Sequence, residues 1–126
     1  MSAKMVFVDT SAWIEYLNKT SHLVVKAVEE CLILNTAVSS QVVLAELLQG
    51  AKSEKEIELI KDLTAIVKIL KESPDTWQDA GLLANRLRKQ GKTLSLIDCY
   101  LAVLAKENKA IILTLDKHFA VIDNYL

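Results

Sequence analysis

Short apolar runs alternate with helical patterns along the whole chain. Residues 5–8 and 110–114 form almost continuously apolar runs, and 32–38 and 65–70 have a weaker strand character. Apolar runs without alternation are typical of parallel strands that are covered on both faces. Together with a final edge strand at the end of the chain, the pattern predicts about five strands in a mostly parallel central sheet.

Between these strands, apolar residues recur at the spacing of helices. The clearest stripe follows Ser73-Pro74 and consists of Trp77, Ala80, Leu83, Ala84 and Leu87. Serines that suit helix N-caps precede five of the six expected helices: Ser11, Ser40, Ser53, Ser73 and Ser95. The alternation of strand and helix predicts one α/β domain over residues 1–126, with helices on both faces of the sheet.

The composition is typical of a globular protein with a proper core. The chain has 126 residues, 52% of them hydrophobic, and no apolar run approaches the roughly 20 residues of a membrane span. The first residues lack the pattern of a signal peptide, so we expect a cytoplasmic protein. Cys31 and Cys99 lie in apolar stretches at a spacing that matches no zinc site, which predicts two thiols in the core.

The net charge of −1 does not indicate nucleic-acid binding. Four cations nevertheless stand close together without an acid between them: Arg86, Arg88, Lys89 and Lys92. They could bind RNA phosphates, which would make binding sensitive to salt. They could equally form a solvated helix end, where positive charges suit the helix dipole. The sequence leaves both interpretations open.

Asp98 stands in an otherwise apolar helical segment, S-L-I-D-C-Y-L-A-V-L-A, from Ser95 to Ala105. Burying an unpaired charge costs several kcal/mol in practice. Asp98 must therefore reach solvent at an edge or be compensated by a partner. We expect it to face a cleft and to share a divalent metal ion with other acids.

Three further acids stand in apolar surroundings. Asp9 ends the first strand, Glu46 interrupts an apolar helix, and Asp116 follows the run 110–114. Each has an ordinary alternative role, as a turn residue or as a residue at the rim of a helix. Ligands of parallel α/β sheets bind beyond the carboxyl ends of the strands. The sequence therefore predicts that Asp9, Glu46 and Asp116 converge with Asp98 on one site.

Converging carboxylates repel one another unless a cation lies between them. Mg²⁺ and Mn²⁺ prefer oxygen ligands, and with substrate phosphate they support hydrolysis of a phosphodiester by activated water. Zinc is disfavoured because the chain has only two histidines and no Cys/His cluster. Nearby hydroxyls either cap helices and turns or orient the carboxylates: Thr10, Ser11, Ser95 and Thr114.

Four blocks of sequence carry a resemblance to a known family. They are D-T-S-A-W-I from Asp9, S-S-Q-V-V-L-A-E-L from Ser39, S-L-I-D-C-Y-L-A from Ser95 and I-I-L-T-L-D-K-H-F from Ile111. In this order they resemble the signature blocks of PIN-domain nucleases. Chain length and block order look most like the single-domain toxin ribonucleases of VapC type. The resemblance covers essentially the whole chain and implies a Rossmann-like sheet.

The resemblance also implies an endoribonuclease that depends on Mg²⁺ or Mn²⁺. Its catalytic and metal-binding acids would be Asp9, Glu46, Asp98 and Asp116, supported by Thr10, Ser11, Ser95 and Thr114. Implied partners are RNA, a second copy in a homodimer, and an antitoxin protein laid over the cleft. Many relatives carry another Asp two residues after the fourth acid, where this chain has His118, so a second metal is expected to bind weakly or only when RNA supplies phosphate ligands. Lys117 and His118 are additional candidate RNA contacts.

Two other functions remain open from the sequence. A catalytically weak PIN-like module could bind RNA or protein without cutting, and absence of cleavage with every metal and RNA would favour it. A phosphotransfer domain with Asp9 as nucleophile is disfavoured, because the D-x-D motif of such enzymes is broken by Ser11. Nucleotide-binding enzymes rank lower still, since neither G-x-x-x-x-G-K-[ST] nor G-x-G-x-x-G is present.

Overall fold

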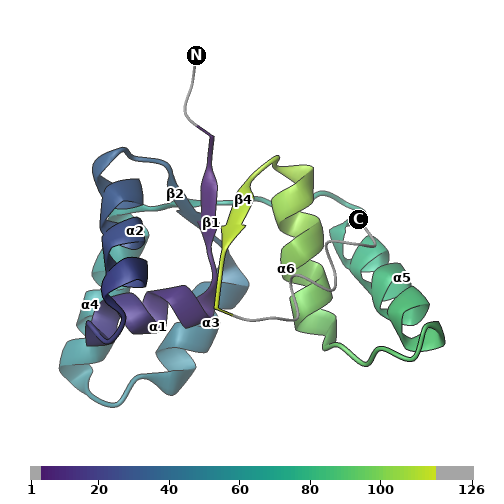
Figure 1. Ribbon diagram of the computed structural model, residues 1–126, viewed down its shortest axis with the longest axis horizontal. Coiled ribbons are helices and arrows are strands. Elements are labelled where there is room, and N and C mark those ends of the chain that lie inside the picture. Colours follow the sequence, from purple (N-terminus) through teal and green to yellow (C-terminus); the bar gives the residue numbers. More distant parts are fainter. Residues whose placement is uncertain (1–3, 116–126) are drawn as a thin grey trace.

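The computed structural model describes residues 4–115, except for the side chain of Thr64. Strands and helices alternate through this range much as the sequence predicts (Figure 1). The strands are β1 (Val6–Val8), β2 (Ala37–Ser39), β3 (Lys68–Ile69) and β4 (Ile111–Leu113). The helices are α1 (Thr10–Asn18), α2 (His22–Ile33), α3 (Gln41–Gly50), α4 (Glu54–Ile66), α5 (Thr76–Lys89) and α6 (Leu96–Glu107).

The four strands form one parallel sheet in the order β3-β2-β1-β4. The first strand therefore lies in the interior of the sheet, between β2 and the last described strand. Its register pairs Val6 with Ala37 on one side and Val8 with Leu113 on the other. Because all strands run the same way, their carboxyl ends meet at one edge of the sheet, where α1 and α3 begin.

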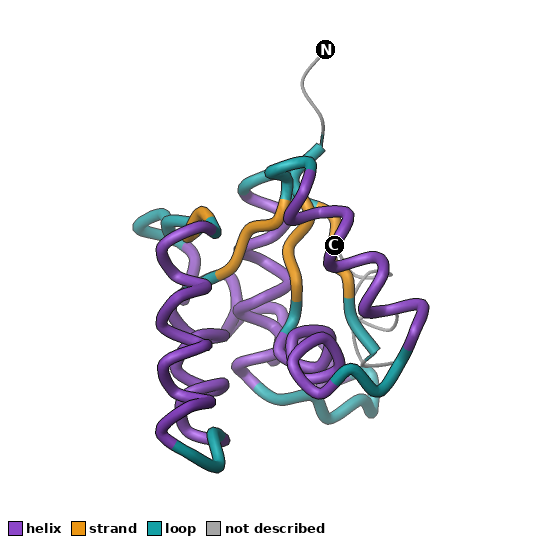
Figure 2. The backbone as a smooth tube through the Cα atoms, turned by 90° about the vertical axis from the view of Figure 1, so that its left-hand side faces the viewer, coloured by secondary structure: helices purple, strands orange, loops and turns teal. Residues whose placement is uncertain are grey.

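Helices cover both faces of this sheet. Neighbouring residues of a strand point to opposite faces, and the adjacent β1 residues Phe7 and Val8 are both 0% exposed. Figure 1 shows α5 and α6 together on one side of the strands and α1 to α4 on the other, and Figure 2 shows the strands flanked by helices in a second view. The predicted α/β architecture is confirmed.

The sheet differs from the prediction in the number and length of its strands. The described residues contain four strands rather than about five, and the expected final edge strand lies outside them. β2 and β3 are shorter than the apolar runs 32–38 and 65–70, because α2 continues to Ile33 and α4 continues to Ile66. Burial on the sheet, rather than local composition, decides where these strands begin.

Three of the predicted N-caps are confirmed by hydrogen bonds. Ser40, Ser53 and Ser95 each accept a hydrogen bond from the backbone N–H three residues later. The other two predictions are wrong, since Asp9 precedes α1 and Asp75 precedes α5. The hydroxyl of Ser11 bonds elsewhere, to groups at the end of β4, and Ser73 accepts from the N–H of Asp75 in the turn before α5.

The core lies between the sheet and its helices. α6 contributes its whole middle section, from Cys99 to Ala105, to this core. Cys99 is 0% exposed and Cys31 is half-buried, which agrees with the prediction of core thiols. Burial, followed by the charge of Asp98, raises the pKa of the Cys99 thiol. Within residues 4–115, no helix is both long and apolar enough to cross a membrane.

Candidate metal-binding and catalytic site

Asp9 lies directly after β1, at the carboxyl edge of the sheet. Its N–H donates to the carbonyl of Leu113 (3.0 Å), and its own carbonyl accepts from Ala12 and Trp13 at the start of α1. The backbone thus serves both the sheet and the helix, while the side chain makes no capping bond. Although Asp9 is only 5% exposed, its carboxylate is left available for another partner.

Two hydroxyls from opposite ends of the chain hold this carboxylate. Ser11 donates to Oδ2 of Asp9 over 3.1 Å, and Thr114 donates to the same oxygen over 2.9 Å. Oδ1 receives no hydrogen bond from the described residues, and no lysine or arginine among them forms an ion pair with Asp9. One carboxylate oxygen is therefore fixed by the protein and the other is available to a ligand.

Ser11 is the centre of a small hydrogen-bond group. Besides bonding to Asp9, its hydroxyl lies 3.2 Å from that of Thr114 and accepts from the N–H of Leu115 over 3.0 Å. These contacts connect the start of α1 to the chain leaving β4. They fix the backbone immediately before Asp116, which itself lies outside the described residues together with Lys117 and His118.

Thr10 links the first acid to the second. Its hydroxyl donates to Oε1 of Glu46 over 2.7 Å. Glu46 stands on α3, which contacts α1, and its side chain is exposed. Consecutive residues at the β1–α1 junction therefore contribute the carboxylate of Asp9 and a clamp on the carboxylate of Glu46. The structure brings these two predicted site residues to the same edge of the sheet.

Asp98 lies in the first turn of α6, three residues after the N-cap Ser95. Its N–H donates to the capping hydroxyl of Ser95 over 3.0 Å, and the residue is half-buried. A carboxylate at a helix start is stabilised by the helix dipole. Part of the cost of burying the charge of Asp98 is therefore offset without a metal ion. In Figure 1 the start of α6 lies at the same end of the molecule as the carboxyl ends of β1 and β4.

The oxygen donors at this edge fit a hard divalent cation. Asp9 and Glu46 each have one oxygen held by a hydroxyl, an arrangement that typically orients metal ligands. Within residues 4–115, no three Asp, Glu, His or Cys side chains form a group compact enough to hold a metal ion. A bound Mg²⁺ or Mn²⁺ would therefore rely on water, substrate phosphate or Asp116 for part of its coordination.

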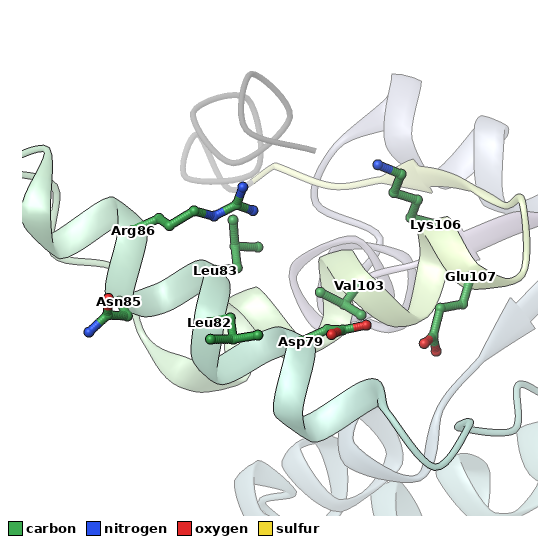
Figure 3. A pocket seen from close by; sticks show the side chains of 8 residues that line it. All are labelled: Asp79, Leu82, Leu83, Asn85, Arg86, Val103, Lys106 and Glu107. Carbon is green, nitrogen blue, oxygen red and sulfur yellow. The ribbon is translucent and has the colours of Figure 1, made fainter.

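The four predicted basic residues do not share one surface. Arg88 and Lys92 line a groove of 350 Å³ at the end of α5 and the start of α6. Arg86 instead lines a larger cavity of 770 Å³ between these helices, where Lys106 and the acids Asp79 and Glu107 also lie (Figure 3). The cluster seen in the sequence is therefore divided between two surfaces.

Two features of the site were missed by sequence reasoning. The amide of Leu115 gives no recognisable pattern, because any residue could supply it. The groove residues of α5, in contrast, have a readable spacing: Gly81, Ala84, Asn85 and Arg88 recur at helical intervals on one face. A search for small and polar residues at that spacing would have indicated the groove.

The sequence model of the PIN domain matches residues 6–125. The chain belongs to the PIN-domain family. The match extends through the blocks that begin at Asp9, Ser39, Ser95 and Ile111, so the resemblance seen in the sequence is confirmed for the family. The described sheet and helices of this PIN domain agree with the predicted fold class.

Solved structures with a similar fold include proteins of VapBC complexes. VapBC2 from Rickettsia felis, bound to a DNA fragment from its promoter, has a TM-score of 0.78 at 23% identity, covering 95% of this chain and 94% of that one. VapBC-1 from nontypeable Haemophilus influenzae gives 0.77 at 24%, covering 97% and 94%. VapBC-5 from Mycobacterium tuberculosis, a member of the VapBC family of toxin-antitoxin systems, gives 0.67 at 21%, covering 96% and 92%. At these identities the similarity establishes the fold of this PIN domain.

Proposed function

We propose that this PIN domain is a metal-dependent endoribonuclease of VapC type that cleaves RNA phosphodiester bonds by activated water. The observation that carries the proposal is the Asp9 carboxylate. It is almost fully buried at the carboxyl edge of the sheet, with Oδ2 held by two hydroxyls and Oδ1 without a donor among the described residues. A carboxylate oriented in this way is suited to bind a cation rather than to support the fold.

Each residue of the site has a role in this proposal. Asp9, Glu46 and Asp98 would hold Mg²⁺ or Mn²⁺, with Asp116 binding directly or through water. The ion, when bound, would neutralise phosphate charge and lower the pKa of a water molecule. Ser11 and Thr114 keep Asp9 in one rotamer, Thr10 does the same for Glu46, and Ser95 fixes the backbone of Asp98. The protein thus supplies orientation before RNA arrives.

The proposed partners follow from the similar structures. Proteins with this fold occur in VapBC complexes, and one of these is a member of a toxin-antitoxin family. We propose that this chain is the toxin of such a pair, with a cognate antitoxin protein and a homodimer as its assembled form. Size measurement of the chain alone, and after co-expression with a protein encoded next to it, tests both assemblies.

The alternative is a PIN-like module that binds RNA or protein with little or no cleavage. One observation favours it: the described acids do not by themselves form a compact three-ligand group. The two functions differ in their dependence on metal. A nuclease loses activity on chelation and regains it with Mg²⁺ or Mn²⁺, whereas a binding module retains its ligand in both conditions and yields no products.

RNA cleavage by acid variants tests the nuclease directly. Asp9→Asn and Asp98→Asn keep side-chain shape but remove a negative ligand, and each should reduce the Mn²⁺-supported rate at least about 100-fold. Asp62→Asn, an exposed acid on α4, is the matched control and should leave the rate unchanged. Wild-type rates in Asp98→Asn would remove that residue from the mechanism, and wild-type rates in both would overturn the proposal.

A further inference from the structure

Helix α5 has two faces of different character. Asp79, Leu82, Leu83 and Arg86 line the cavity toward α6, where two acids and two cations balance in charge among the described lining residues. Arg88 lies two residues beyond Arg86, which rotates it by about 200° around the helix. It lines the groove on the other face together with Gly81, Ala84 and Asn85, of which Asn85 also lines the cavity. The cations of the segment are therefore divided between a neutral cavity and a separate groove.

The charged residues that the structure describes in the groove on this second face are both positive. Among residues 4–115 its lining includes Arg88 and Lys92 but no acid, and the remaining residues are small, polar or apolar: Gly81, Ala84, Asn85, Thr93, Leu94 and Leu96. The amide of Asn85 and the hydroxyl of Thr93 provide neutral hydrogen-bonding groups. This composition suits an extended polyanion with apolar parts, such as a single RNA strand.

The turn between the helices fixes Lys92 beside Arg88. Gly91 has a φ of +78°, which a residue with a side chain rarely adopts. Its N–H donates to the carbonyl of Arg88 (3.0 Å), and the N–H of Lys92 donates to that of Leu87 (2.9 Å). This pair of bonds closes the last turn of α5 and reverses the chain. Lys92 is therefore attached to an ordered backbone at the end of the groove.

The groove leads to the proposed catalytic edge. Leu96, which lines the groove, is 48% exposed and is the first residue of α6. Asp98 follows two residues later, a rise of about 3 Å along the helix and a rotation of about 200° around it, so the path between them passes over the N-terminus of α6. An RNA strand that reaches Asp98 can therefore continue over the start of α6 and into the groove. A surface free of acids is needed there, because the carboxylates of the site repel the phosphates on either side of the cleaved bond.

We infer that the groove between Arg88 and Lys92 binds the phosphates of the RNA strand next to the cleaved bond, and that Arg86 and Lys89 do not. This inference rests on the proposed RNA substrate. It assigns a direction to the bound strand, from Asp98 across Leu96 toward the end of α5. It also separates a binding role from a helix-stabilising one, because Arg86, Arg88 and Lys89 all stand in the last turn of α5.

Fluorescence anisotropy with a short single-stranded oligoribonucleotide in EDTA measures binding without cleavage. Arg88→Ala and Lys92→Ala should each weaken binding about 3- to 10-fold and reduce the salt slope by about one. Lys89→Ala is the matched control, since it removes a cation from the same helical turn but none from the groove. It should change affinity less than about 2-fold. Equal losses for Arg88→Ala and Lys89→Ala would overturn the inference.

A second variant blocks the groove without changing any charge. A Cβ added at Gly81 meets no atom within 4 Å, so a side chain there extends into open space. Gly81→Leu should therefore fold normally, as circular dichroism would check, and bind RNA several-fold more weakly. Gly81→Ala, which adds only a methyl group, should bind as the wild type does. Unchanged affinity in Gly81→Leu would overturn the inference.

The outcomes separate this inference from the nuclease proposal. If Arg88→Ala and Gly81→Leu weaken binding but the wild type cuts no RNA with Mg²⁺ or Mn²⁺, the RNA-binding role of the groove is supported and the nuclease proposal is contradicted. If the wild type cuts RNA and both variants bind and cut as well as it does, the nuclease proposal is supported and the role of the groove is contradicted. Polyglutamate serves as a probe for an acidic protein partner. If Arg88→Ala and Gly81→Leu weaken the binding of polyglutamate but not the binding of RNA, RNA would be overturned as the occupant of the groove.

Discussion

The hydroxyl of Thr114 donates to Oδ2 of Asp9 over 2.9 Å, although the two residues are 105 positions apart. The parallel pairing of β1 with β4 produces this contact. Val8 pairs with Leu113 in the register, so the next residue of each strand leaves the same edge of the sheet. The pairing of β1 with β4 thus brings Asp9 and Thr114 together, and the hydrogen bond between them depends on this pairing.

Thr114→Val tests whether this contact orients the proposed catalytic carboxylate. Valine keeps the shape of threonine but cannot donate to Asp9, whereas Thr114→Ser keeps the hydroxyl. Loss of one orienting hydrogen bond should reduce metal-dependent RNA cleavage about 10- to 100-fold. The free energy of unfolding, measured by thermal unfolding, should change by only about 1 kcal/mol. Wild-type cleavage by Thr114→Val would show that Ser11 alone suffices to hold Asp9.

Thr10→Val removes the clamp on Glu46 and tests a more exposed part of the site. Because Glu46 is exposed, its free side chain would sample several rotamers, and metal binding would have to select one of them. We expect about a tenfold rise in the Mn²⁺ concentration that gives half-maximal cleavage, with a smaller change at saturating metal. Thr10→Ser is the control. An unchanged metal requirement in Thr10→Val would contradict the role of the clamp.

Tyr100 gives the fold a dependence on alkaline pH. Burial, followed by the hydrogen bond that its hydroxyl donates to Glu72 (2.6 Å), raises the pKa of Tyr100 above its ordinary value of 10.0. A raised folded pKa means that the neutral phenol stabilises the fold below pH 10.0, and that this contribution is lost as pH rises above that value. Wild-type protein should therefore lose more stability than Tyr100→Phe in this range.

Thermal unfolding of wild type and Tyr100→Phe at neutral and alkaline pH measures this difference. At neutral pH the variant should be less stable by about 1 kcal/mol, since Glu72 is exposed and can be solvated when its partner is lost. The thiol of Cys99 also has a raised pKa, but it is present in both proteins and cancels in the comparison. Parallel losses of stability in the two proteins would contradict the assignment to Tyr100.

Adjacent leucines of α5 test the packing of this helix on α6. Leu83 is 1% exposed and Leu82 is 57% exposed, although both line the neutral cavity. Leu83→Ala should lower the free energy of unfolding by about 2–5 kcal/mol, because it leaves a void in the core. Leu82→Ala should change it by no more than about 0.5 kcal/mol. Chemical denaturation with urea would measure both, and equal effects would contradict the described packing.

Local pattern predicted the sequence of elements because each of its cues acts over a few residues. Ser40, Ser53 and Ser95 cap their helices as expected, since an N-cap requires only a hydroxyl and the N–H three residues later. Ser11 did not follow this rule, because its hydroxyl is used by Asp9 and by the N–H of Leu115. A partner more than 100 residues away cannot be read from helix propensity.

In the candidate site, too, local features could be predicted from the sequence and long-range contacts could not. Asp9 was identified by its position after an apolar run, and the structure places its carboxylate at the expected edge. Asp98 was identified as a charge in an apolar segment, and its place in the first turn of α6 gives it a second explanation, because a carboxylate there is stabilised by the helix dipole. Arg86 and Arg88 lie about 200° apart around α5. Which of them lines the cavity is decided by the packing of α5 on α6, which the cluster of charges in the sequence did not specify.

The central position of β1 has a consequence for the time at which the proposed nuclease could become active. Its neighbour β4 is made about a hundred residues later during synthesis. A chain that is still growing on the ribosome therefore has Asp9 but neither Thr114 nor Asp116. The proposed ribonuclease would therefore be inactive during its own translation. The messenger RNA and the ribosome that make it would not be cleaved before the last segment emerges.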